Sequence, residues 1–245
     1  MNLPDVNIKQ LLEAGVHLGH KTLRWNPKMK KFIFGEKNSI HIIDLTKTVV
    51  FLNNALKEIH KCISSGGKIL IVSTKKQAAE QISKLAEETN QYFVNFRWLG
   101  GILTNWTTIQ NSIKRMKFLE TELSKEDIGF TKKEIIKLEK EKEKLKKSLG
   151  GIAEMKKIPN MLFVIDTNIE SLAIKEAIKL NIPIAAILDS NSDPTDITFP
   201  VPGNDDARRS INLYCELLKN TIDDASKFIS NDPKSKKTEL EAKQS

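Results

Sequence analysis

The sequence has few cysteines, few arginines and no long apolar run. Its two cysteines, Cys62 and Cys215, form neither a CxxC pair nor a zinc-binding spacing, so we expect small core residues in a reducing compartment. No apolar run reaches the roughly 18 residues that a membrane-spanning helix needs. The stretch MNLPDVNIKQLLEAG resembles neither a signal peptide nor a transit peptide, which predicts a cytosolic protein.

The glycine-rich motifs of nucleotide-binding proteins are also missing. No GxGxxG follows a predicted strand, and GxxxxGK[ST] does not occur. SSGGK at 64–68 precedes a strand, whereas a phosphate-binding loop follows one. There is no GxSxG elbow, and His17, His20, His41 and His60 lack the spacing of a catalytic triad. These absences argue against a Rossmann-type enzyme.

A basic excess is the main compositional feature of the 245 residues, whose formal net charge is +8. Such an excess favours an acidic partner, nucleic acid first and an anionic membrane second. With 40% hydrophobic residues, the chain can bury the core of one large α/β domain or two small ones. Arginine is rare, yet Arg24 and Arg97 each precede a tryptophan, and guanidinium groups stack and bind phosphate in ways that lysine cannot.

Strand and helix patterns alternate along most of the chain, which predicts a parallel sheet with helices on both faces. Strands are expected at 39–45, 68–73, 92–96, 161–166, 182–188 and 198–201. Helices are expected at 7–14, 46–63, 75–88 and 169–180, with a last helix capped by Asn204 or Asp205 and running to about residue 228.

One segment, 104–149, interrupts this alternation because it carries no strand signal. An apolar ladder from Trp106 to Leu123 is followed by a predicted turn at 126–130 and then by a lysine-rich heptad pattern with Lys142 at one apolar position. The pattern predicts an antiparallel helical hairpin, a two-stranded coiled coil, which we call the arm. The resulting division is one discontinuous α/β domain (1–103 and 150–228), the arm (104–149) and a disordered tail (229–245).

The stretch HLGHKTLRWNPKMKKFIFG, residues 17–35, is called the basic segment because no acid occurs between Glu13 and Glu36. It is expected to be a loop with short extended pieces. Its lysines can neutralise phosphates, and its aromatic residues can stack on bases or anchor the loop to the core. A loop merely pinned by Phe32 and Phe34 would leave the missing acids unexplained.

Two acidic stretches, LDSNSDPTD (188–196) and PGNDDARRS (202–210), follow strand ends, where doubly wound folds keep their sites. The simpler interpretation is that these aspartates cap helices and make turns. The alternative is that some of them hold a hard cation together with His20. The carboxylates concerned are Asp189, Asp193, Asp196, Asp205 and Asp206.

Four long motifs resemble a known family. They are AGVHLGHKTLRWNPKMKKFIFGEKNSIHIIDLTKT (14–48), RWLGGILTNWTTI (97–109), MLFVIDTNIESLAIKEAIKLNIPIAAILDSNSDP (161–194) and FPVPGNDDARRSI (199–211). In order and spacing they are similar to bacterial small-subunit ribosomal protein two, over about residues 7–225. The resemblance implies a flavodoxin-like, parallel five-stranded sheet with an inserted helical hairpin.

The resemblance also implies a structural protein without catalysis, cofactor or metal. It would bind small-subunit rRNA on the solvent side of the subunit, between head and body, and support late assembly and the docking of ribosomal protein one. Its partners would be that rRNA and neighbouring ribosomal proteins, with no membrane and no small-molecule substrate. An organelle-encoded member would look similar.

The expected RNA contacts form three groups, each holding phosphates rather than reading bases. The basic segment supplies Lys21, Arg24, Trp25, Lys28, Lys30 and Lys31; the root of the arm supplies Arg97, Lys114, Arg115 and Lys117; and the arm supplies Lys140, Lys144 and Lys147. Two other functions stay open at this point. One is a cation-dependent enzyme or phosphoacceptor domain using Asp189 and Asp205, and the other is a protein-binding scaffold that uses the arm and the 205–228 helix.

Overall fold

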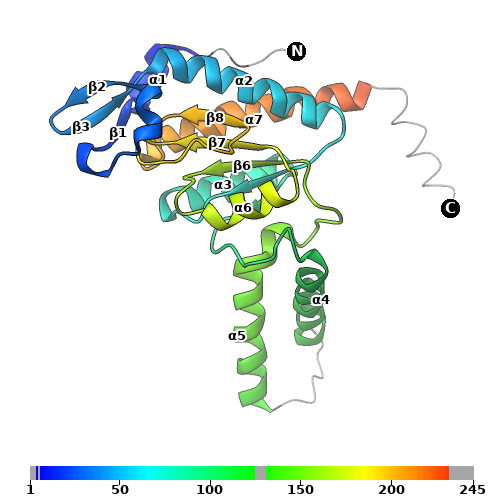
Figure 1. The fold of residues 1–245 in the computed structure, drawn as a ribbon. Helices are drawn as coiled ribbons and strands as arrows, with labels where there is room; N and C mark the ends of the chain where they lie inside the picture. The colour runs from blue at the N-terminus through cyan, green and yellow to red at the C-terminus, as the bar shows by residue number, and fades with distance from the viewer. Residues whose placement is uncertain (1–3, 5, 125–130, 232–245) are drawn as a thin grey trace.

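A five-stranded parallel sheet lies at the centre of the computed structural model, which describes residue 4, residues 6–124 and residues 131–231 (Figure 1). Its strands are β4 (Ile69–Val72), β5 (Tyr92–Val94), β6 (Met161–Ile165), β7 (Ile184–Leu188) and β8 (Phe199–Pro202). They follow the order β5-β4-β6-β7-β8, and every neighbouring pair is parallel. This flavodoxin-like order confirms the predicted fold class.

Helices cover both faces of this sheet because successive strand residues point to opposite sides. Ile69 and Ile71 face one apolar core with α1 (Ile8–Ala14), α2 (Leu45–Ser64), α3 (Lys76–Glu88) and α7 (Arg208–Asn231). Leu70 and Val72 face a second core with α6 (Ser171–Lys179) and the residues at the root of the arm. The β4 and β6 strands are buried along their whole length, which explains their uninterrupted apolar sequences.

A second, antiparallel sheet carries the basic segment. The strand predicted at 39–45 is confirmed, but it belongs to this sheet, which the sequence analysis did not predict. It consists of β1 (Leu18–Lys21), β2 (Ile33–Lys37) and β3 (Ile40–Ile43) in the order β1-β3-β2. Asn38 and Ser39 both have positive φ, the geometry of a tight hairpin turn between β2 and β3. Residues 17–35 were expected to be a loop with short extended pieces. The extended pieces are β1 and the start of β2, and the 3-10 helices η1 (Thr22–Arg24) and η2 (Pro27–Phe32) lie between them.

The arm consists of two antiparallel helices that project from one side of the body (Figure 1). They are α4 (Trp106–Leu123) and α5 (Lys132–Leu149), followed by the 3-10 helix η3 (Gly150–Ile152). Each has 18 residues and is therefore roughly 27 Å long. The apolar ladder of α4 is buried at Ile109, Ile113, Met116 and Leu119. Coiled-coil packing of the two helices stays a prediction.

The remaining expectations differ from the structure by a few residues at element ends. The last helix ends at Asn231, beyond the expected boundary at 228. Just before its first turn, the Asn204 side chain accepts hydrogen bonds from the backbone N–H groups of Asp206 and Ala207. The expected turn at 126–130 and the tail beyond Asn231 lie outside the described residues. Cys62 and Cys215 are free thiols, and no helix within the described ranges is long and apolar enough to cross a membrane.

Candidate nucleic-acid interface

The basic segment is held against the body by two buried side chains on η2. Met29 and Phe32 have almost no exposed surface and pack into the core on the α6 side of the main sheet. The backbone N–H of Asn26 also donates to the carbonyl of Ser190, in the loop after β7. The charged side chains between these buried positions remain in solvent. Phe32 is therefore a core residue that anchors the segment.

Other large apolar side chains of the basic segment remain exposed beside the lysines. Phe34 is 81% exposed and Leu23 is 95% exposed. Trp25 is partly exposed and lies against His41, with 5.2 Å between ring centroids. Phe34 therefore does not pin the segment to the core, contrary to one sequence interpretation. Exposed aromatic rings among cations are suited to stacking on nucleic-acid bases.

The root of the arm is organised around one buried carboxylate, Glu176 on α6. It accepts hydrogen bonds from the Trp98 indole nitrogen at 3.0 Å, from the backbone N–H groups of Gly101, Leu103 and Thr104, and from the Thr104 hydroxyl. Burial raises its pKa, but these hydrogen bonds outweigh that effect and leave the pKa below its ordinary value. Gly101 has a φ of +90°, a backbone conformation that glycine adopts without strain and that lets the chain turn sharply there.

This carboxylate was missed by sequence reasoning, although a signal existed. Glu176 lies on the buried face of an otherwise apolar helical pattern, between Ala173 and Ala177. A charged residue at a core-facing position needs partners, because burying an unpaired carboxylate is costly. Its partners are the N–H groups that a sharp chain turn leaves without acceptors. Glu176 therefore fixes where the chain leaves the sheet for the arm.

All thirteen predicted RNA-contact residues are exposed in the structure. Three of the twelve cations among them form ion pairs: Lys28 with Asp193, Arg115 with Glu141, and Lys117 with Glu154. For the other nine, no carboxylate of the described residues lies within ion-pair distance. They are Lys21, Arg24, Lys30, Lys31, Arg97, Lys114, Lys140, Lys144 and Lys147.

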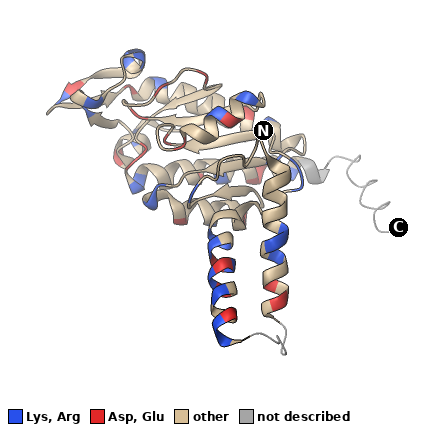
Figure 2. Ribbon diagram, turned by 60° about the horizontal axis from the view of Figure 1, so that its bottom comes forward, with Lys and Arg blue, Asp and Glu red and all other residues tan. Residues whose placement is uncertain are grey.

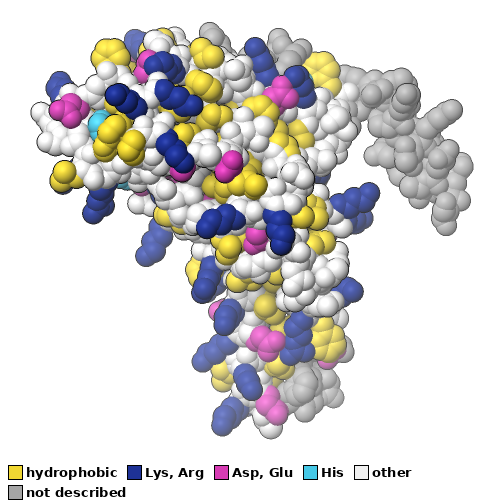
Figure 3. All heavy atoms as spheres, in the orientation of Figure 1, with side chains coloured by type: hydrophobic (Ala, Val, Ile, Leu, Met, Phe, Trp, Pro, Cys, Tyr) yellow, Lys and Arg dark blue, Asp and Glu magenta, His cyan; other side chains and the backbone are white. Residues whose placement is uncertain are grey.

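The cations extend over much of the molecule and along the arm. Figure 2 shows basic positions along the ribbons of both arm helices, with acidic positions interspersed. Figure 3 shows Lys and Arg side chains projecting along the arm and from the body above it. A groove of about 710 Å³ lies between α3, β5 and the base of α5, and its lining includes Phe96, Lys146 and Lys147. The structure brings the root and arm groups together, and it places the basic segment on a separate sheet.

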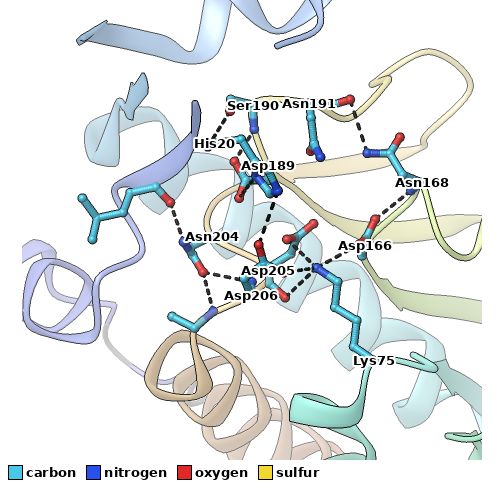
Figure 4. A network of polar contacts seen from close by, with 12 residues as sticks. His20, Lys75, Asp166, Asn168, Asp189, Ser190, Asn191, Asn204, Asp205 and Asp206 are labelled. Carbon is cyan, nitrogen blue, oxygen red and sulfur yellow. Dashed lines mark hydrogen bonds and ion pairs between the residues drawn. The ribbon is translucent and has the colours of Figure 1, made fainter. Parts of the chain in front are cut away.

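The acidic turns meet at the carboxyl edge of the main sheet. Asp166 follows β6, Asp189 follows β7, and Asp205 and Asp206 follow β8, while Lys75 follows β4 (Figure 4). The Lys75 Nζ lies 2.8 Å from Asp166, 2.7 Å from Asp205 and 2.6 Å from Asp206. We call these five residues, together with His20 of β1, the carboxylate cluster.

His20 links the small sheet to this cluster through both of its ring nitrogens. Its Nδ1 lies 2.9 Å from Asp189 and its Nε2 lies 3.4 Å from Asp206. The hydrogen bond with Asp189 raises the pKa of His20. Burial, together with the charges of Asp166 and Asp189, raises the pKa of Asp205 to about 7.

The prediction that aspartates from the two acidic turns meet was partly right. Asp189, Asp205 and Asp206 come together with His20, as that alternative required. Asp193 instead binds Lys28 and the Thr195 hydroxyl, which makes it a turn residue. Sequence reasoning missed Lys75 and Asp166, although both follow buried strands at the same edge of the sheet.

Comparisons with known proteins agree with this architecture. The family described as ribosomal protein S2 matches residues 11–225 of the chain. The small ribosomal subunit protein uS2 of Gluconacetobacter diazotrophicus is 56% identical over 222 residues, which cover 91% of this chain and 85% of that protein. Those of Sinorhizobium medicae and Brucella suis are each 55% identical over 218 residues, covering 89% of this chain and 86% and 85% of theirs.

The family match spans both the sheet and the arm, and it includes the motifs at 14–48, 97–109, 161–194 and 199–211 in full. The match therefore includes the carboxylate cluster, the whole basic segment and the root of the arm. On this evidence, the chain belongs to the ribosomal protein S2 family.

Proposed function

We propose that this chain is an RNA-binding structural component of the small ribosomal subunit, and that it holds small-subunit rRNA with the basic segment and the arm. Its relatives are named as small ribosomal subunit proteins, which supports a structural, non-enzymatic role in translation. In a bacterium such a protein resides in the cytoplasm, on the ribosome. The observation that carries the proposal is the set of nine exposed cations without a carboxylate partner among the described residues.

Unpaired cations favour RNA because each phosphate contact releases counterions. A solvated protein surface usually mixes both signs, and neighbouring acids would repel an RNA backbone. In the basic segment, Lys21, Arg24, Lys30 and Lys31 face solvent without such acids within ion-pair distance, as far as the structure describes the chain. Trp25 and Phe34 add exposed rings to the same surface. Together they suit an irregular RNA surface that is recognised by shape and by phosphate contacts.

The two charged regions lie on different projections of the body. The basic segment belongs to the small sheet, and the arm leaves the body on another side (Figure 1). A molecule with two separate cationic projections is suited to bridging RNA elements that lie apart. This arrangement supports the proposed position on the solvent side of the subunit, between head and body, and a contribution to late assembly.

Docking of ribosomal protein one is part of the same proposal. Exposed apolar side chains on η1, in the turn before α6 and on α6 offer surface for a protein partner; they include Leu23, Ile169 and Leu172. A protein contact of this kind would survive treatment with RNase, whereas the rRNA contacts would not. This difference separates the two kinds of partner in one experiment.

Sedimentation of a cell lysate through a sucrose gradient, with and without RNase, tests the proposal. We expect the chain to sediment with the small subunit and to be released by RNase. The variant Lys28→Ala/Lys30→Ala/Lys31→Ala should be depleted from the small subunit. A matched control, Lys57→Ala/Lys61→Ala/Lys84→Ala, removes three exposed lysines of α2 and α3 outside the proposed contact groups. Normal incorporation of the first variant would remove the basic segment from the interface.

A further inference from the structure

The groove of about 710 Å³ beside β5, which we call the edge groove, is lined by residues within 79–87, 90–96 and 146–154. Small-ligand sites in proteins usually measure about 300–1,000 Å³, so its size is sufficient for one. β5 is the edge strand of the main sheet, and after it the chain runs into the arm, so within the described residues no strand pairs with its outer side. The edge groove therefore lies on an uncovered side of the sheet.

An exposed aromatic ring lines this groove. Phe96 follows β5 by two residues, and its side chain is 58% exposed. Small residues line the same space, among them Ala79, Gly150 and Gly151, so a flat group can come close to the protein backbone there. A phenylalanine ring that lies open beside such a space is available to stack on a flat partner.

The edge of β5 offers little to an added peptide strand. The Val94 carbonyl accepts the N–H of Ser73 after β4, so the backbone groups of the preceding residue, Phe93, face the outer side. Gly151 covers the Phe93 carbonyl there, because a Cβ added at Gly151 would lie 2.2 Å from that oxygen. A strand that adds to a sheet needs a row of free backbone groups. The edge groove is therefore poorly suited to strand addition by a protein.

The charges of the groove nearly cancel, and an unpaired cation lies next to its exposed ring. The lining carries two lysines and two glutamates, and one of each already forms an ion pair with a residue of α4. The second lysine, Lys147, is exposed and has no carboxylate of the described residues within ion-pair distance. Arg97 directly follows Phe96 and is also exposed and unpaired within the described ranges. A nucleotide has the matching character, since its base is neutral and its phosphate is anionic.

An asparagine amide in the lining can bind the edge of a base. Asn95 Nδ2 donates a hydrogen bond to the Ala79 carbonyl at 3.0 Å, which fixes the amide group. None of the described residues donates a hydrogen bond to its Oδ1. Adenine, guanine and cytosine carry an exocyclic amino group that such an oxygen accepts, whereas uracil has none. Asn95 therefore favours a base with an amino group.

We propose that the edge groove holds one unstacked nucleotide of small-subunit rRNA. The Phe96 ring stacks on its base, Asn95 accepts a hydrogen bond from its amino group, and Arg97 and Lys147 bind the neighbouring phosphates. This inference rests on the proposed function, and it adds a contact that reads a base to contacts that hold phosphates. Proteins commonly recognise single-stranded RNA by stacking splayed-out bases on aromatic side chains. The nucleotide would fix the RNA at the point where the arm leaves the body.

Competition for small subunits that lack this protein tests the contribution of the ring. Labelled full-length chain is bound to the depleted subunits, and unlabelled variants displace it. Phe96→Ala should bind about tenfold more weakly than the unmodified chain, as expected for the loss of one stacked base, and Phe96→Tyr should bind as the unmodified chain does. The loss for Phe96→Ala should be the same at two salt concentrations, whereas the loss for Lys147→Ala should shrink at the higher one.

Phe228→Ala is the matched control, because Phe228 is a 46% exposed phenylalanine on α7 outside the groove. It should compete as the unmodified chain does, and circular dichroism should show that all variants are folded. Equal competition by Phe96→Ala and the unmodified chain overturns the inference and leaves the proposed function intact. Failure of the unmodified chain to bind the depleted subunits overturns the proposed function, and the inference with it.

Ultraviolet crosslinking of intact small subunits separates a nucleotide in the groove from a neighbouring protein. After digestion with RNase and trypsin, mass spectrometry should find one nucleotide joined to the peptide 85–97, LAEETNQYFVNFR, which contains both Asn95 and Phe96. The mass of the adduct identifies the base, and subunits that carry Phe96→Ala should lack this adduct. RNA adducts on the basic segment but none on this peptide would overturn the inference alone.

Discussion

Lys28 and Asp193 are separated by 165 positions in the sequence, yet Lys28 Nζ lies 2.8 Å from Asp193 Oδ2. The hydrogen bond from Lys28 is the main cause of a pKa of about 2 for Asp193, so the carboxylate stays charged at neutral pH. Both side chains are about half exposed, and such pairs contribute little stability. The main effect of the pair is instead that the Asp193 carboxylate competes with an RNA phosphate for the Lys28 ammonium group.

Removing that competitor should strengthen RNA binding. We expect Asp193→Asn to raise the affinity of the chain for a small-subunit rRNA fragment about two- to fivefold at low salt, and Lys28→Ala to lower it. Fluorescence anisotropy at two salt concentrations measures both effects. Asp196→Asn, a nearby turn substitution outside the pair, is the control. Weaker binding by Asp193→Asn would mean that Asp193 positions Lys28 for its phosphate contact.

The arm lysines should contribute to RNA affinity through charge alone. We expect Lys140→Ala/Lys144→Ala/Lys147→Ala to weaken binding and to lower the slope of log affinity against log salt by about 2–3, because each lost phosphate contact removes nearly one released counterion. Titrations over a range of salt concentrations give that slope. Lys57→Ala/Lys61→Ala/Lys84→Ala is again the control. An equal slope for the two triple variants would show that RNA does not lie along α5.

The five hydrogen bonds accepted by Glu176 predict a stability effect that is large for one charged residue. Glu176→Gln replaces one acceptor oxygen with a donor that faces backbone N–H groups, and it should lower the free energy of unfolding by about 3 kcal/mol. Urea denaturation followed by circular dichroism measures this loss. Glu87→Gln, at an exposed position on α3, should cost less than about 0.5 kcal/mol. Equal losses in the two variants would contradict the assigned role of Glu176.

The same carboxylate predicts how stability depends on pH. Burial opposes ionisation of Glu176, but its hydrogen bonds prevail, so its folded-state pKa lies below the ordinary value of 4.5. A lowered pKa contributes stability that is fully present above pH 4.5 and is lost as pH falls through the folded-state pKa. Urea midpoints from neutral pH down to about pH 3 should therefore fall more steeply for the unmodified chain than for Glu176→Gln. Parallel curves would show that the pKa of Glu176 is not lowered.

The main sheet could be predicted from the sequence because its strands are buried on both faces. Segments such as Ile69–Val72 and Ile184–Leu188 are uninterrupted apolar runs between helical patterns, and such runs have few alternative structures. The arm was equally predictable, since α4 repeats its apolar residues with helical spacing. Long, periodic segments of this kind specify their own structure locally.

The small sheet was harder to predict because contacts far along the chain stabilise it. Its strands have four or five residues and carry charges on both sides of their apolar positions, so alternation is weak. What holds the segment is the burial of Met29 and Phe32 in a core built mostly from residues after position 70. The polar sites were hard to predict for the same reason. The ion pair of Lys75 with Asp166 and the hydrogen bonds of Glu176 join residues that only the fold brings together.

The point at which the arm leaves the sheet has a consequence for how the family can vary. β5 is an edge strand, and the chain must pass β4 before it re-enters the sheet at β6. In a doubly wound fold this crossover usually contains a helix, and here the whole arm occupies that place. Whole helical turns can therefore be gained or lost in α4 and α5 together without shifting any strand register. Natural selection can therefore change the length of the arm independently, while the order and register of the strands stay the same.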